Sequence, residues 1–167
     1  MHLRTLCRIR LHITSYSPLK LLVVVETRFA SIIIMLKRLF QVKHNLQNMV
    51  ISEEWMSSRE DYVGKAQTMR DYVLNDLWWD MVAYILRFTR PIYEMLQVAD
   101  TDAPILHKVY EMWDSIIENV KKEIYQHEGK EDYEESPFYD VVHNIHIERW
   151  TKNCTPLHCL AHSLNLK

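Results

Sequence analysis

Residues 76–98 read DLWWDMVAYILRFTRPIYEMLQV, and this stretch decides the fold. On a helical wheel its polar positions form one narrow stripe, made of Asp76, Asp80, Arg87, Arg90, Glu94 and Gln97. A surface helix usually has an apolar stripe of about 100° or more, whereas here the polar stripe is the narrow one. The pattern predicts a helix that neighbours wrap on most sides, with Asp76 as its N-cap and a kink or break near Pro91.

A second long helix is predicted after a short connection. Asp102 and Pro104 suit its first turn, and Gly129 marks its end. Its apolar residues recur on one face: Ile105, Val109, Trp113, Ile116, Val120 and Ile124. Because the connection is short, we predict that the two helices form an antiparallel hairpin.

Helical spacing extends to both sides of this hairpin. Before it, we predict a helix from Thr27 through a bend to Val50, a turn capped by Ser52, and a weaker helix over 59–75. After it, helices are predicted over 136–150 and 155–164. Residues 19–25 fit a short strand or the run-in to a helix. The predicted fold is all-α or nearly so, a helical bundle with a long antiparallel hairpin.

Composition excludes several classes of protein. A chain of 167 residues is most simply one domain, and its two glycines leave no glycine-rich nucleotide-binding loop. Three cysteines without a C-x-x-C pair argue against a disulfide framework and favour a reducing compartment. No apolar run reaches the roughly 18 residues of a membrane span, so we expect no membrane partner. No pattern indicates a cofactor or a small-molecule substrate.

Charge is unevenly distributed along the chain. Residues 1–50 carry a formal charge of +7 and the remaining 117 residues carry −9. The basic part suits a nucleic-acid partner or an anionic surface, and it equally suits a solvated basic face. Residues 1–25 contain no acid, which is typical of a mitochondrial presequence, but apolar residues alternate from Cys7 to Ile13 as in a half-buried strand.

Two groups of side chains resemble metal sites. Cys154, His158, Cys159 and His162 can all bind zinc, but a helix this short rarely presents four ligands to one centre, so we predict no metal and keep this set as the alternative. His143 and His146 lack the H-E-x-x-H pattern of metallohydrolases, and their spacing is more typical of a polar helix edge.

Several segments, taken in order, resemble plant proteins related to hAT-superfamily transposases. They include ETRFASIIIMLKR from Glu26, VLNDLWWD from Val73, FTRPIYEML from Phe88, DTDAPILHKVYEMWDSIIE from Asp100 and TPLHCLAHSLN from Thr155. The resemblance covers residues 17–167, so we predict a divergent basic segment over 1–16 followed by a single domain. That domain resembles the helical insertion of the transposase with a stub of its ribonuclease H-like part.

The resemblance implies a protein without catalytic activity. The family's first two catalytic aspartates would precede residue 1 and its glutamate would follow Lys167, so the carboxylates of a two-metal mechanism are missing. We therefore expect a transposase-derived remnant that acts in the nucleus by binding DNA, with the mitochondrion or cytoplasm as alternative locations. The resemblance aligns Phe29, beside Arg28, with the family's base-stacking tryptophan, and Lys37 and Arg38 are further candidate contacts. The favoured alternative is that Phe29 is a core residue and Arg28 a surface charge, because the rest of a DNA channel is missing. The alternatives are a helical protein-interaction module, which binds through exposed helix faces, and a zinc-binding structural protein.

Overall fold

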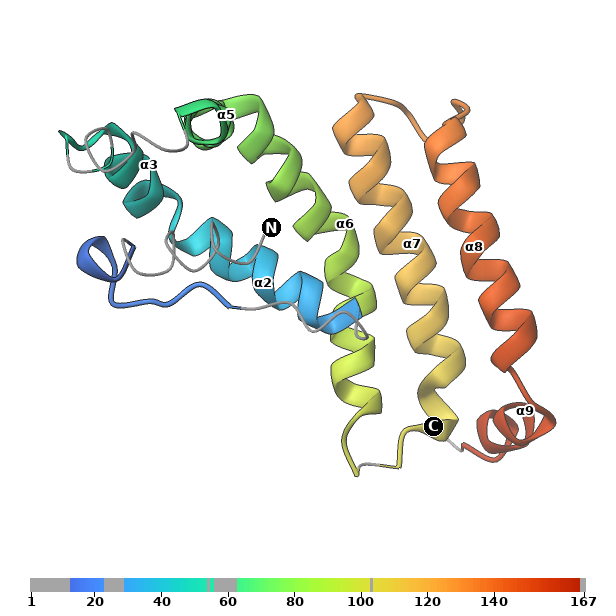
Figure 1. Ribbon diagram of the computed structural model, residues 1–167. Helices are drawn as coiled ribbons and strands as arrows, with labels where there is room; N and C mark the ends of the chain where they lie inside the picture. The colour runs from blue at the N-terminus through green and yellow to red at the C-terminus, as the bar shows by residue number, and fades with distance from the viewer. Residues whose placement is uncertain (1–12, 23–28, 54, 56–62, 103, 166–167) are drawn as a thin grey trace. The chain divides into compact units, whose positions relative to one another are not determined.

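The computed structural model describes residues 13–22, 29–53, 55, 63–102 and 104–165, and its regular structure is entirely helical (Figure 1). The elements are α2 (Phe29–Gln41), α3 (Lys43–Ile51), α5 (Val63–Leu74), α6 (Asp76–Ala99), η1 (Leu106–Lys108), α7 (Val109–Glu128), α8 (Pro137–Asn153) and α9 (Pro156–Ser163). No strand occurs in the described part of the chain, which confirms the all-α prediction. Of the proposed strand over 19–25, residues 19–22 are irregular and 23–25 lie outside the described residues.

The chain divides into two compact units, Met1–Leu86 (unit 1) and Arg87–Lys167 (unit 2), and the boundary falls inside α6. The predicted limits of a segment over 1–16 and a domain over 17–167 stay a prediction, because residues 1–12 lie outside the described residues. The charge asymmetry follows the units: unit 1 has a formal charge of +3 and unit 2 of −5.

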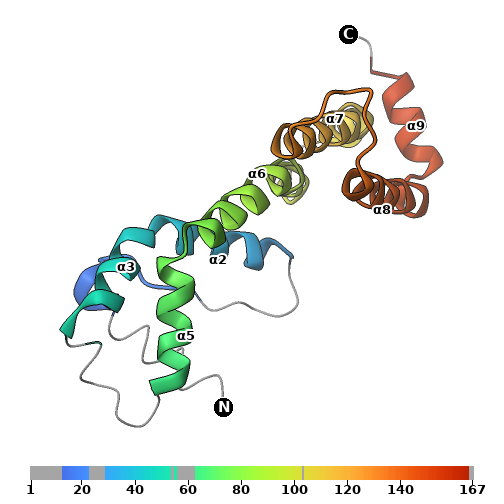
Figure 2. The ribbon, with the colours of Figure 1, turned by 90° about the horizontal axis from the view of Figure 1, so that it is seen from above.

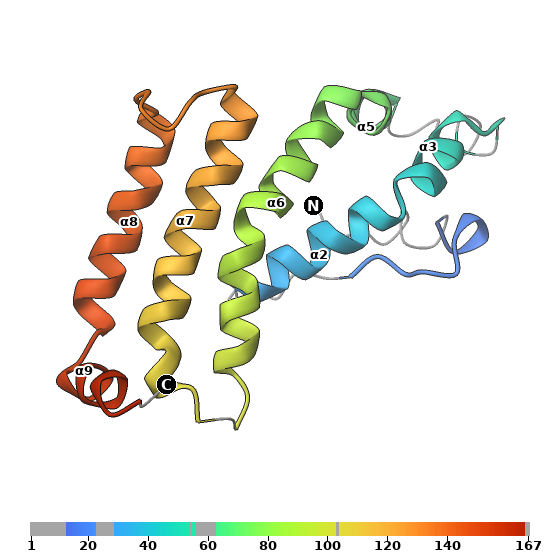
Figure 3. The same cartoon turned by 180° about the vertical axis from the view of Figure 1, so that it is seen from behind.

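The core of unit 1 lies where α3, α5 and the first turns of α6 meet (Figure 3). It contains Ile13, Val42, Leu46, Met49, Val50, Trp55, Ala66, Val73 and Trp79. Trp79 is 1% exposed, and its indole Nε1 donates a 2.7 Å hydrogen bond to the carbonyl oxygen of Val73 at the end of α5. This bond fixes the corner between α5 and α6, because one buried ring contacts both sides of the joint. The predicted bend between α2 and α3 is confirmed at Val42.

The start and the surroundings of α6 differ from the prediction. The helix begins at Asp76, but the Asn75 side chain accepts the capping hydrogen bond from the backbone N–H of Trp78 at 3.3 Å. Asp76 instead forms an ion pair with Lys43 at 3.4 Å. The expectation that neighbours wrap this helix on most sides is wrong within unit 1, because Leu77 is 78% exposed. Neighbouring elements of unit 1 cover the side of α6 that carries Trp79, whereas the side that carries Leu77 is exposed to solvent.

Pro91 does not end α6, which continues to Ala99. A proline in a helix interior loses one backbone hydrogen bond and costs about 3 kcal/mol or more. Thr89 and Tyr93 on either side of it are buried, so packing offsets this cost. The prediction of a break near residue 91 is therefore wrong, and the alternative of a kink there stays a prediction.

Unit 2 is built on the predicted hairpin. In Figures 1 and 2, α7 lies between the second half of α6 and α8. Arg87 pairs with Glu123 at 3.7 Å, and Val98 and Lys108 line the other end of the same groove, so α6 and α7 run antiparallel. Ile116, Val120 and Ile124 are buried along α7, as the apolar face predicts.

The two ends of α7 test the predicted start and end of this helix. The helix begins at Val109, after the 3-10 turn η1, so the prediction that Asp102 and Pro104 start it is wrong. Its end is confirmed at Gly129, whose φ of 66° is the left-handed conformation that glycine adopts at lowest cost. The start of α8 is also confirmed, because the buried Ser136 hydroxyl accepts a 3.0 Å hydrogen bond from the backbone N–H of Tyr139.

Candidate functional site

The outer face of α8 carries an exposed apolar stripe, and its first residue, Phe138, also contacts the ring of Phe88 on α6 edge to face at 5.9 Å. Phe138, Val141 and Ile145 recur at helical spacing and are 43%, 58% and 54% exposed. Single exposed apolar residues are ordinary, but three in a row on one helix face indicate an interaction surface. We call these three residues the α8 stripe.

Charges of opposite sign stand at the two ends of the α8 stripe. Before α8, the exposed side chains of Glu131, Asp132, Glu134 and Glu135 form an acidic end. Near its last turn lie the exposed cations Arg149 and Lys152, the latter paired with Glu148 at 3.6 Å. An exposed ion pair of this kind is worth about 0–1 kcal/mol, so it can exchange partners at little cost. The surface is therefore apolar in its middle and polarised along its length.

The inner face of α8 packs on α7 through several ring pairs. The edge-to-face pairs are Tyr125–Tyr139 at 5.6 Å, Trp113–His146 at 5.9 Å and Tyr110–Trp150 at 4.8 Å between centroids. Such pairs contribute about 0.5–1.5 kcal/mol each beyond the apolar area that they bury. They hold α8 in place so that its other face points away from α7.

The prediction that His143 and His146 form a polar edge is wrong for His146. This side chain is 9% exposed, against the ring of Trp113. Burial lowers the pKa of His146, and the nearby His143 lowers it further, while a hydrogen bond with the backbone of Val142 acts in the opposite direction. The imidazole serves as a packed ring and stays neutral near pH 7, because its charged form is the one that burial disfavours.

At the far end of the same interface, two thiols meet one phenol. The Tyr110 hydroxyl oxygen lies 2.7 Å from Sγ of Cys159 and 3.3 Å from Sγ of Cys154. These hydrogen bonds with Cys154 and then Cys159 raise the pKa of Tyr110. The ring of Tyr110 also stacks at 5.1 Å on His162, so the first turn of α7 holds both the end of α8 and α9.

The alternative zinc ligands do not converge. Cys154 and Cys159 meet at Tyr110, but Nδ1 of His158 turns to Thr155, whose backbone N–H donates to it at 3.1 Å in a capping box. His162 approaches the carbonyl oxygen of His107 at 3.3 Å. No three His, Cys, Asp or Glu side chains gather as a possible cation site anywhere in the described residues.

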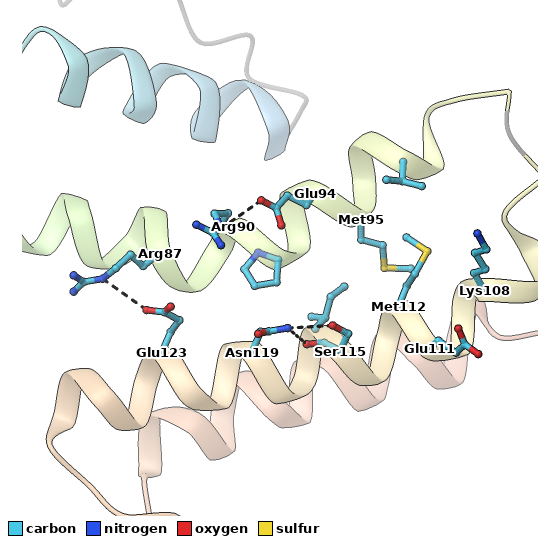
Figure 4. A pocket seen from close by; sticks show the side chains of 13 residues that line it. Arg87, Arg90, Glu94, Met95, Lys108, Glu111, Met112, Ser115, Asn119 and Glu123 are labelled. Carbon is cyan, nitrogen blue, oxygen red and sulfur yellow. Dashed lines mark hydrogen bonds and ion pairs between the residues drawn. The ribbon is translucent and has the colours of Figure 1, made fainter.

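A groove of about 390 Å³ lies between α6 and α7 in unit 2 (Figure 4). Its lining includes Pro91, Met95, Val98, Met112 and Ile116, together with three cations and three carboxylates. Arg87 pairs with Glu123, and Arg90 with Glu94 at 3.3 Å. Because the charges balance and two pairs are closed, the groove has no net charge with which to select an anion or a cation.

The predicted nucleic-acid residues are only partly described. Arg28 lies outside the described residues, and Phe29 opens α2 without a described side chain. Lys37 and Arg38 are both half-buried on α2. Lys43, in the same basic region, is engaged by Asp76 and stands 5.5 Å from the ring centre of Trp79. In the described part of residues 13–50, Lys20 is exposed, whereas Lys37, Arg38 and Lys43 are half-buried.

Sequence reasoning did not single out Tyr110 or the outward face of α8. Tyr110 is 44 residues from Cys154, and no local pattern links them. The α8 stripe does have a signal, because Phe138, Val141 and Ile145 share one helical face that differs from the face of His146.

No protein-family model, curated protein or solved structure matches the chain. None of the helices in the described residues is long and apolar enough to cross a membrane.

Proposed function

We propose that this chain is a non-catalytic, helical binding module of a hAT transposase-like protein, and that the α8 stripe joins two copies of it. The observation that supports the proposal is the polarised surface of α8, which is apolar in the middle, acidic before its first turn and basic near its last. Most homo-oligomers are two-fold symmetric, and a two-fold interface must be complementary to itself. An apolar patch with opposite charges at its two ends meets that requirement.

The register of the pair follows from the sequence. When two α8 helices lie antiparallel and cross between Val141 and Ile145, the apolar side chains of both copies meet at the centre. Lys152 of one copy then lies toward the acidic end of the other, which precedes α8 and includes Glu134. The dimer has two such pairs, one at each end, so the charges favour the antiparallel arrangement and oppose the parallel one.

The size of the surface sets the strength of the dimer. An α8 of 17 residues is about 26 Å long at 1.5 Å per residue. A single pair of helices of this length buries less area than the roughly 1,200–2,000 Å² of a stable complex. We therefore expect a weak dimer whose population depends on protein concentration.

Sedimentation velocity over a range of concentrations tests the proposal with a matched pair of variants. Ile145→Glu places a charge at the centre of the α8 stripe and should abolish the dimer. Ile147→Glu makes the same change at a position that is 42% exposed on another side of the helix, and should leave the dimer unchanged. A chain that stays monomeric at every concentration, or two variants that behave alike, refutes the role of the stripe.

A charge exchange tests the register separately. Lys152→Glu should weaken the dimer, because it brings like charges together at both ends. Glu134→Lys in the same chain should restore it, since each pair is then reversed. Failure of the double variant to recover would show that the two helices meet in another register.

The second candidate function is binding of nucleic acid through the basic amino-terminal part. The charge of +7 over residues 1–50 favours it. Affinity for single-stranded or hairpin DNA should fall steeply with salt, since bound cations release counterions from the phosphates. It should also fall in Phe29→Ala and Arg38→Ala. Absence of measurable binding at low salt excludes this candidate and leaves the proposed dimer intact.

A further inference from the structure

Cys154 and Cys159 approach the same oxygen atom, the hydroxyl of Tyr110. The distances of 3.3 and 2.7 Å place the two sulfur atoms within 6.0 Å of each other. A phenol hydroxyl has one proton to donate, so it can donate to one sulfur while it accepts from the other thiol. The hydroxyl therefore holds two free thiols side by side without joining them.

The local sequence explains why the two cysteines are neighbours. Thr155 is the N-cap of α9 and Pro156 its first residue, so Cys154 occupies the position before the cap and Cys159 the fourth position of the helix. Side chains at these two positions regularly pack on each other across a helix start, where apolar residues form a hydrophobic staple. The capping box between Thr155 and His158 fixes the entry angle of the chain. The closeness of the two thiols is thus built into the start of α9.

We propose that Cys154 and Cys159 are a reversible dithiol switch that a hydroperoxide converts to a disulfide across the start of α9. Cys159 is exposed and Cys154 half-buried, so Cys159 reacts first. Its thiolate attacks the peroxide, the O–O bond breaks, and the products are a sulfenic acid and water. The thiolate of Cys154 then attacks that sulfur, the S–O bond breaks, and the departing hydroxide takes a proton to leave as water.

Overall, two thiols and one molecule of hydrogen peroxide give one disulfide and two molecules of water. The sulfurs are oxidised and the peroxide oxygens are reduced, and an added thiol reverses the change by exchange. Disulfide bonding draws the two sulfurs to about 2.05 Å, away from their shared hydrogen bonds. Tyr110 then loses the hydrogen bond that it accepts from a thiol, while its ring contacts with Trp150 and His162 remain. Oxidation therefore loosens the attachment of α9 to the first turn of α7.

Intact mass after limited hydrogen peroxide tests the proposal in the full chain carrying Cys7→Ser, so that only two thiols remain. The expected product is a monomer that has lost two hydrogens and regains them with dithiothreitol. In Cys154→Ser the reaction should stop at a sulfenic acid on Cys159, which dimedone traps, whereas the parent should give little adduct. In Cys159→Ser the half-buried Cys154 should react more slowly.

Tyr110→Phe is the test of the geometry. It keeps the ring and removes the hydroxyl that holds both sulfurs, so the disulfide should form about fivefold faster, the factor that corresponds to one ordinary hydrogen bond. In urea the two proteins should react at equal rates. Three results overturn the proposal: sulfenic acid that persists at Cys159 beside an intact Cys154, disulfides that form only between chains, or equal rates of the two proteins when both are folded.

Discussion

Replacement of Trp79 by phenylalanine tests how the corner between α5 and α6 is held. The change removes the indole donor that lies 2.7 Å from the carbonyl oxygen of Val73, and leaves that oxygen only a 3.5 Å contact with the side chain of Gln47. A buried acceptor that loses its partner costs about 1–3 kcal/mol. The smaller ring adds about 1–2 kcal/mol at roughly 0.8 kcal/mol per buried methylene. We expect the free energy of unfolding of unit 1 to fall by about 2–5 kcal/mol.

Trp78→Phe is the matched control. Trp78 is the adjacent tryptophan, half-buried, and its ring contacts Tyr72 and Trp79 at 6.3 and 4.7 Å. Because this site is only half-buried, we expect a loss of about 1 kcal/mol or less. Urea unfolding followed by far-ultraviolet circular dichroism measures the free energy of unfolding of both variants. Benzothienylalanine at residue 79 keeps the size of the ring but has no N–H donor, so it separates the effect of the lost hydrogen bond from that of the lost volume. If Trp79→Phe is no more damaging than Trp78→Phe, the corner does not depend on this hydrogen bond.

Two further predictions concern unit 2 and a matched pair of glycines. Gly129→Ala should lower the free energy of unfolding by about 1–2 kcal/mol, because its φ of 66° disfavours a Cβ. Gly64→Ala should raise it by up to about 1 kcal/mol, because a Cβ at this position in α5 meets nothing within 4 Å. Thermal unfolding measures both changes, and changes of the same sign would contradict the prediction. Because burial lowers the pKa of His146, its contribution to stability is fully present above the unfolded pKa of about 6.5 and is lost as pH falls through the folded pKa. Urea unfolding between pH 7.5 and 5 should show this loss, and His146→Phe should reduce the pH dependence; an unchanged slope would exclude His146 as its source.

The candidate site could be predicted in part. The zinc alternative grouped Cys154 with Cys159, which do lie together, but it added His158, whose Nδ1 is occupied by the capping box. The third partner, Tyr110, could not be found, since only the packing of α9 on the start of α7 brings it to the thiols. His146 was placed on a polar edge because of its spacing from His143, although it shares the α7-facing side of α8 with Trp150.

The amino-acid sequence by itself determined the helices and several of their ends, because the period of apolar residues, a glycine after a last turn and a Ser-Pro start act within one helix. Gly129 and Ser136 are where the local signals place them. Tertiary structure decided the rest. It carried α6 through Pro91, left Leu77 exposed beside two tryptophans at the start of α6, and brought one hydroxyl to two sulfurs from 44 and 49 residues away. Burial, exposure and distant pairing depend on which helix faces meet, and that is a property of the whole packed chain.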